Sequence, residues 1–172
     1  MSGLVFFARS IMLKNQINDK NYQLMQKQQE LQDLQAYTAA IADGEVSLQD
    51  LTTAPAGMFG QMTNYMVASH NYASGAAQQN MAYLQGTNQG QAQGQDAQAQ
   101  AQYQQLVFKN LYDTQKSQFL KAEQARLQVK EKAMDNEILK LENQLKTLEA
   151  EYQQVSQASD KAAQSEAPKY VA

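Results

Sequence analysis

The feature that most constrains the fold is a heptad repeat of apolar residues in the last third of the chain. Six residues lie seven apart, and they are Leu120, Leu127, Met134, Leu141, Leu148 and Val155. A second apolar column accompanies them downstream, formed by Ile138, Leu145 and Tyr152. Because a stripe that recurs every 3.5 residues needs a facing helix, this spacing predicts a heptad helix over residues 106–164 that buries the stripe against a partner.

A similar but less complete seam marks the beginning of the chain. Lys20 and Lys27 interrupt one of its columns, so the apolar stripe is broken there. We predict a long N-terminal helix with an apolar start over residues 1–43. Gly44 is the expected stop, because glycine accepts the left-handed conformation that closes a helix. The apolar seam residues of this helix are Ile17, Leu24, Leu31, Leu34 and Ile41.

Residues 44–56 have the signals of a corner. Ser47 is followed three residues later by Asp50, which is the spacing of a capping box at the start of a helix. Pro55 is expected to end that helix, because the residue before proline disfavours the helical conformation. We predict a short helix within a helix-breaking corner.

Residues 57–84 form a helix of a different kind, rich in Met, Tyr and small residues. Met58, Met62, Tyr65 and Tyr72 follow helical spacing on one face. Methionine fills irregular gaps and also suits adaptable binding surfaces. The face is therefore predicted to serve core or lateral packing, with a binding surface as the alternative.

Residues 85–105 are low in complexity. Gly86, Gly90 and Gly94 weaken a helix, and the Gln/Ala run between them is polar and carries little charge. This segment is predicted to be a loop at the tip of a hairpin or a flexible linker. Residues 165–172 are predicted to be a short tail.

The composition agrees with a thin helical seam better than with a deep core. Leu, Ile, Val and Phe make up less than a fifth of the 172 residues, and glutamine alone occurs 30 times. We therefore predict an all-α, elongated protein of the helical hairpin or coiled-coil type. Its long N- and C-terminal helices would enclose a shorter Met/Tyr-rich middle helix.

Few residues are available for chemistry. The chain has no cysteine, which excludes thiolate metal sites and cysteine nucleophiles. The single histidine, His70, has no acidic residue near it in sequence, since the flanking acids are Asp50 and Asp96. We predict that the protein is not an enzyme and has no cofactor, metal or small-molecule substrate.

The charges are segregated along the chain. Residues 1–27 and 109–132 are net basic, whereas residues 28–108 and 133–172 are net acidic. These regions could pair between subunits or within a hairpin. Nucleic-acid binding is not expected, because the whole chain has a net charge of −3 and a pI of about 5.1.

The N-terminal segment holds an apolar cluster that is a predicted docking end. Residues 4–13 could contact an anionic membrane surface, aggregate as a strand, or be buried between subunits, and burial between subunits is favoured. No cleavable signal peptide or membrane span is predicted, so the protein would be cytoplasmic or exported by a signal-independent route. The docking residues are Leu4, Val5, Phe6, Phe7 and Ile11.

The order of long helix, polar centre and heptad helix resembles, in layout alone, that of subunits of helical extracellular filaments, including those exported by type III secretion systems. We predict a non-enzymatic structural protein that self-assembles through its helical seams into a homo-oligomer, such as a filament or tube, and the resemblance implies the same. One alternative is a coiled-coil scaffold or adaptor docked on a membrane or a larger machine. A further alternative is a viral scaffolding or tail-associated protein.

Overall fold

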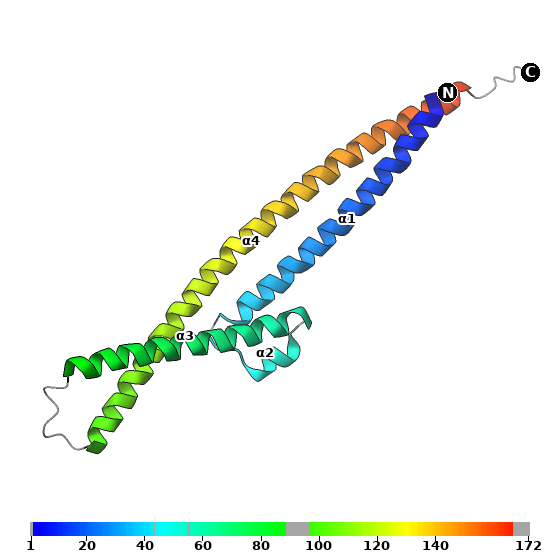
Figure 1. Cartoon of the computed structure of the whole chain (residues 1–172). Helices are drawn as coiled ribbons and strands as arrows, with labels where there is room; N and C mark the ends of the chain where they lie inside the picture. The colour runs from blue at the N-terminus through cyan, green and yellow to red at the C-terminus, as the bar shows by residue number, and fades with distance from the viewer. Residues whose placement is uncertain (1, 43, 55, 89–96, 167–172) are drawn as a thin grey trace, which may run out of the picture. The chain divides into compact units, whose positions relative to one another are not determined.

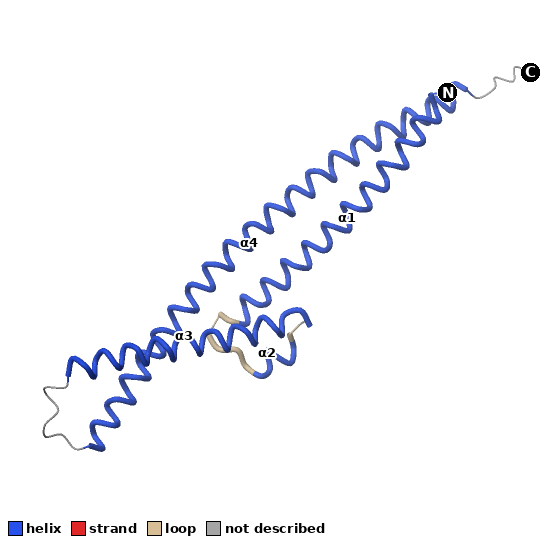
Figure 2. Tube along the Cα trace, in the orientation of Figure 1, coloured by secondary structure: helices blue, strands red, loops and turns tan. Residues whose placement is uncertain are grey.

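The computed structural model describes residues 2–42, 44–54, 56–88 and 97–166, and over these residues the protein is all-α (Figure 1). The helices are α1 (Ser2–Ala40), α2 (Leu48–Thr53), α3 (Ala56–Asn88) and α4 (Ala97–Glu166). The described part contains no strand, and its non-helical segments flank α2 (Figure 2). The predicted fold class is confirmed.

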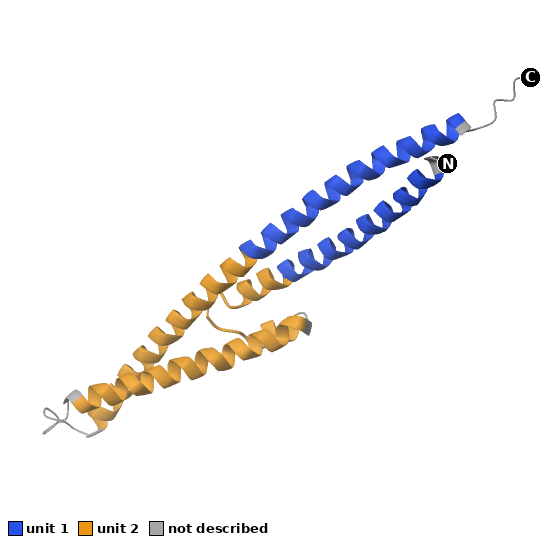
Figure 3. Ribbon diagram, turned by 45° about the horizontal axis from the view of Figure 1, so that its top comes forward, with its two compact units in different colours: residues 1–32, 132–172 blue, residues 33–131 orange. Residues whose placement is uncertain are grey.

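The chain divides into two compact units (Figure 3). Unit 1 combines residues 1–32 with residues 132–172, and unit 2 consists of residues 33–131. Each unit therefore contains a part of α1 and a part of α4.

Unit 1 is an antiparallel pair of helices. Arg9, near the start of α1, binds Glu151 in the C-terminal part of α4, and Lys27 binds Glu137 farther along the pair. Leu13 of α1 is fully buried, although α1 is mostly exposed elsewhere in this unit. The hairpin predicted from the two heptad patterns is present here.

The predicted loop over residues 85–105 is wrong at both of its ends. Helix α3 continues to Asn88 and α4 begins at Ala97, so residues 85–88 and 97–105 are helical. Alanine and glutamine favour helix, which explains the early start of α4, whereas in the extension of α3 the single glycine, Gly86, costs only about 1 kcal/mol and does not end the helix. The predicted tail begins two residues too early, since α4 includes residues 165 and 166. Residues 89–96 and 167–172 lie outside the described part.

A glycine turn and local hydrogen bonds form the corner after α1. Gly44 has a φ of 75° and its N–H donates to the Ile41 carbonyl at 2.9 Å, as expected of a glycine that closes a helix. Ser47 Oγ accepts from the Asp50 N–H at 3.1 Å, while the Ser47 N–H donates to Asp50 Oδ2 at 2.8 Å. These hydrogen bonds complete the predicted capping box. The hydrogen bond that the Ser47 hydroxyl donates to Asp50 Oδ2, followed by the one from the Ser47 N–H, holds the pKa of Asp50 below its usual value. Pro55 lies outside the described residues.

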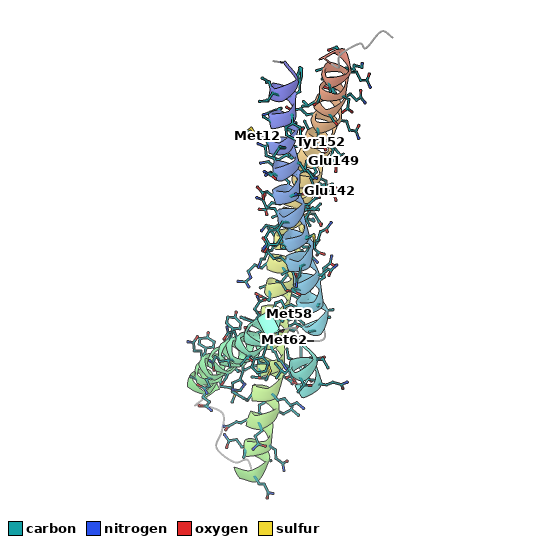
Figure 4. All side chains as sticks on the ribbon, turned by 90° about the vertical axis from the view of Figure 1, so that its right-hand side faces the viewer. Met12, Met58, Met62, Glu142, Glu149 and Tyr152 are labelled. Carbon is teal, nitrogen blue, oxygen red and sulfur yellow. The ribbon has the colours of Figure 1, made fainter. Side chains whose placement is uncertain are left out.

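Unit 2 has its core along α3. Met58, Met62 and Tyr65 are buried on one face of the helix, and Figure 4 shows the two methionines on this helix. The face continues with small residues, and the ring of Tyr65 contacts that of Phe119 on α4 with centroids 5.8 Å apart. The small buried residues are Ser69, Ala73 and Ala77.

Candidate helix-packing interface

The predicted seam residues of unit 1 lie on the faces where α1 and α4 meet. On α1, Ile17, Leu24 and Leu31 are half-buried. On α4, burial follows the heptad spacing, so the stripe that the sequence assigns to self-association is covered within one chain. The buried residues of that stripe are Met134, Ile138 and Leu145, and the half-buried ones are Leu141, Leu148, Tyr152 and Val155.

Leu13 is a seam residue of unit 1 that was not predicted from the sequence. It lies seven residues before Lys20, in the column that continues through Lys27 to Leu34 and Ile41. The two lysines are half-buried and interrupt the apolar column, so the heptad pattern did not reveal Leu13 upstream of them. Extending the seven-residue interval upstream across both lysines would have identified Leu13.

The remaining seam residues belong to the core of unit 2. Leu34, Ile41 and Leu127 are buried, and Leu120 is half-buried. A Cβ atom built on Gly44 would lie 3.1 Å from Leu120 Cδ2, so the glycine turn fits closely against α4. Within unit 2 these predicted seam residues therefore belong to an enclosed core.

Opposite charges join the two helices of unit 1. Arg9 Nε donates to Glu151 Oε1 at 3.1 Å, and Lys27 Nζ lies 2.9 Å from Glu30 Oε2 and 3.3 Å from Glu137 Oε2. The hydrogen bonds that Lys27 donates to Glu30 and then to Glu137 raise the pKa of Lys27. The basic residues 1–27 therefore contact the acidic residues 133–172 of the same chain. Of the two alternatives for the segregated charges, this is pairing within a hairpin.

A groove of about 900 Å³ runs along unit 1 between α1 and α4. Lys20 and Lys140 contribute to its lining, together with Asp19 and Leu139. Most of the other lining residues carry amide or hydroxyl groups, although the surface that lines the groove is mainly apolar. The amide and hydroxyl residues are Gln16, Gln23, Asn136, Asn143, Gln144 and Thr147.

The predicted docking end is exposed on one side of α1. Leu4 is 78% exposed and Phe7 60%, and Val5 and Ile11 are also exposed, whereas Phe6 is half-buried on the α4 side. Met12 extends this apolar surface and points away from α4 (Figure 4). Met12 follows Ile11 directly in the sequence but was not among the predicted docking residues.

The predicted Met/Tyr face belongs mainly to the core of unit 2. Met58, Met62 and Tyr65 are almost fully buried, which corresponds to the core alternative rather than to a lateral surface. Tyr72 is 48% exposed and its ring contacts Phe119 with centroids 5.5 Å apart. Of the four residues, only Tyr72 offers much surface to another molecule.

Two buried tyrosines in this core have different surroundings. Burial, followed by the charge of Glu123, raises the pKa of Tyr37 to about 12, and the interaction of its hydroxyl with that carboxylate adds to the effect. Burial also raises the pKa of Tyr65. The Tyr65 hydroxyl has no hydrogen-bond partner among the described residues.

We expect Tyr65→Phe to leave the free energy of unfolding unchanged or to raise it by up to about 1 kcal/mol, because it removes a buried hydroxyl without a partner. The ring contact with Phe119 is retained. In the matched variant, Tyr37→Phe should lower the free energy by about 1 kcal/mol, since the Glu123 carboxylate then loses a donor. Urea unfolding followed by circular dichroism measures both, and equal losses would contradict the assignment.

The histidine lies outside both cores. His70 is exposed, and its Nδ1 lies 3.0 Å from the Tyr112 hydroxyl. The described residues contain no group of three or more potential metal ligands. Within the same residues, no helix combines the length and the apolar character needed to cross a membrane.

Comparison with protein-family models, with curated proteins and with solved structures finds no match for this chain.

Proposed function

We propose that this protein is a non-enzymatic structural subunit that self-associates by helix packing, as a filament or tube subunit does. The observation that carries the proposal is the exposed apolar surface at the beginning of α1. Leu4, Val5 and Phe7 are each at least 60% exposed, and Ile11 and Met12 extend the surface by a further turn. Contiguous exposed apolar surface of this kind marks interaction sites in soluble proteins.

The intramolecular seam supports the same conclusion. The seam side chains of unit 1 pack against the other helix of the same chain, so their burial does not require a second molecule. The side chains left for assembly are on the opposite side of α1. Helices with two apolar faces are typical of bundles that contain more than two helices.

The test is light scattering of the full chain over a wide concentration range, with negative-stain microscopy at the highest concentration. We expect the mean mass to rise with concentration. The double variant Val5→Glu, Phe7→Glu should shift the rise to at least about tenfold higher concentration, because charges replace apolar contacts that assembly would bury. Its helix content should remain that of the parent, since both side chains are exposed.

Val129→Glu is the control, because Val129 is also exposed but lies on α4. A mean mass equal to the monomer at every concentration would contradict the proposal. Membrane docking is tested in parallel by flotation with vesicles that contain anionic lipid. Flotation abolished by the double variant, without any self-association of the parent, would favour an adaptor instead.

A further inference from the structure

The outward face of α1 in unit 1 carries a second heptad pattern, distinct from the seam that meets α4. Its eight positions alternate spacings of four and three residues, and every one of them is exposed. Leu4 is 78% exposed near the beginning of the pattern, and Tyr22 is 63% and Met25 67% exposed near its end, so large exposed side chains are present toward both ends. We call this set the outer stripe, and its members are Leu4, Ala8, Ile11, Asn15, Asn18, Tyr22, Met25 and Gln29.

No member of the outer stripe is charged. In a surface helix the side opposite the core is normally the most polar and charged. A stripe of this spacing suits the packing of a further helix, because alternating intervals of three and four keep its side chains on a facing partner. The helix α1 therefore has two helix-binding faces, of which α4 covers one.

We infer that the outer stripe binds the same stripe of a second copy of this chain, in parallel and in register. The inference rests on the proposed self-association and specifies its contact. In heptad terms, Ala8, Asn15, Tyr22 and Gln29 occupy position a, and Leu4, Ile11, Asn18 and Met25 occupy position d.

The residues that flank the outer stripe determine which partner helix it binds and in which orientation. In a parallel coiled coil, a g residue of one helix lies beside the e residue five positions later in its partner. Lys14 occupies a g position and Asp19 is the e residue five positions later. Each would pair with the other across the dimer, and neither has an ion pair within the described part of its own chain.

The other flanking positions agree with the same arrangement. Phe7 would meet Met12 of the second copy, which pairs two apolar side chains, and Asn21 would meet Gln26, which pairs two amides. An antiparallel arrangement instead places g beside g and e beside e, so Lys14 and Asp19 would lie on opposite sides of the interface. Only the parallel register pairs each flanking residue with a complementary one.

The polar residues within the stripe are consistent with this contact. An asparagine at an a position fixes the register and the number of strands in a parallel coiled coil, at a cost in stability. Asn15 occupies such a position near the middle of the stripe. We therefore expect a weak, specific dimer that forms with rising concentration.

A lipid surface fits the outer stripe less well than a second copy of the chain does. Arg9 is already engaged by Glu151, so its charge is not free to bind an anionic headgroup. The two asparagines at the centre of the stripe also lack the apolar character that membrane insertion needs.

Charge reversal tests the inference on the full chain by sedimentation equilibrium. Lys14→Glu and Asp19→Lys should each weaken dimerisation by about tenfold, because each replaces two opposite-charge contacts in the dimer by like charges. The double variant should restore it, and so should an equimolar mixture of the two single variants. Lys132→Glu is the control, since Lys132 is exposed on α4 of the same unit.

Cysteine cross-linking tests the register, because the natural chain has no cysteine. A Met25→Cys variant should form a disulfide-linked dimer on mild oxidation, since parallel packing places the two copies of this residue side by side. Val129→Cys should not. In an antiparallel contact, Met25 would face Ala8 instead, and the variant would remain monomeric under denaturing conditions.

The outcomes separate the inference from the proposed function. If the parent chain self-associates but neither the charge reversals nor the cross-linking behave as expected, the inference fails and the proposed function stands. If the parent chain is monomeric at every concentration, both fail. If Ile11→Glu abolishes flotation with anionic vesicles and no dimer forms, the stripe binds lipid and the inference is overturned.

Discussion

Replacing Leu13 with alanine is expected to lower the free energy of unfolding by about 2–5 kcal/mol, the range found for truncation of a buried leucine. Leu13 is 0% exposed and lies in the seam between α1 and α4 of unit 1. The substitution removes apolar contacts and leaves a cavity, because the flanking helix backbones can close only part of the space. The loss should be measured by urea unfolding followed by circular dichroism.

Leu139→Ala is the matched control, because the same chemical change is made at a residue of unit 1 that is 55% exposed. Its expected effect is within about 0.5 kcal/mol. Hydrogen exchange should show faster opening of residues 4–20 in the Leu13 variant and not in the control. Similar losses in the two variants would mean that α1 does not bury Leu13 against α4.

Replacing Gly44 with alanine is expected to lower the free energy of unfolding by about 1–3 kcal/mol. Two effects act in the same direction. A residue with a Cβ atom is disfavoured in the left-handed conformation, and the φ of Gly44 is +75°. The new methyl group would also lie 3.1 Å from Leu120 Cδ2, so that Leu120 has to shift.

Gly75→Ala is the control, and its expected effect has the opposite sign. Gly75 lies within α3, and a Cβ atom at this position meets no atom within 4 Å. Alanine is the better helix former, so this variant should gain about 0.5–1 kcal/mol. Thermal and urea unfolding of the two variants compare them directly, and a loss in both would show that the effect is not one of backbone conformation.

The sequence predicted the features that depend on residues close together in the chain. The capping box of Ser47 and Asp50 and the glycine stop at Gly44 were predicted correctly, because both depend on local hydrogen bonds and backbone conformation. The low-complexity segment was partly misassigned. Its glycines suggested a loop, but the high helix propensity of the Gln and Ala residues at its end starts α4 at Ala97, and Gly86 does not prevent α3 from continuing to Asn88.

The candidate interface could be predicted only in part. A heptad repeat states that a helix needs a partner, but the pattern is the same whether the partner belongs to the same chain or to another. The outer stripe escaped the sequence analysis because asparagine and glutamine residues alternate with its apolar residues. The outer stripe can be recognised as a surface only when the side of α1 that faces α4 is known.

The amino-acid sequence by itself determined that the chain is helical, where the corner between its helices lies, and which spacing its apolar residues share. Only the tertiary structure decided that α4 covers the inner face of α1, that Leu13 is the fully buried residue of that seam, and that Met58, Met62 and Tyr65 form a core. The physical reason is that helix formation and capping depend on interactions over a few residues. The choice of a partner depends on contacts between distant segments, and a segment of the same chain is present at a high effective concentration.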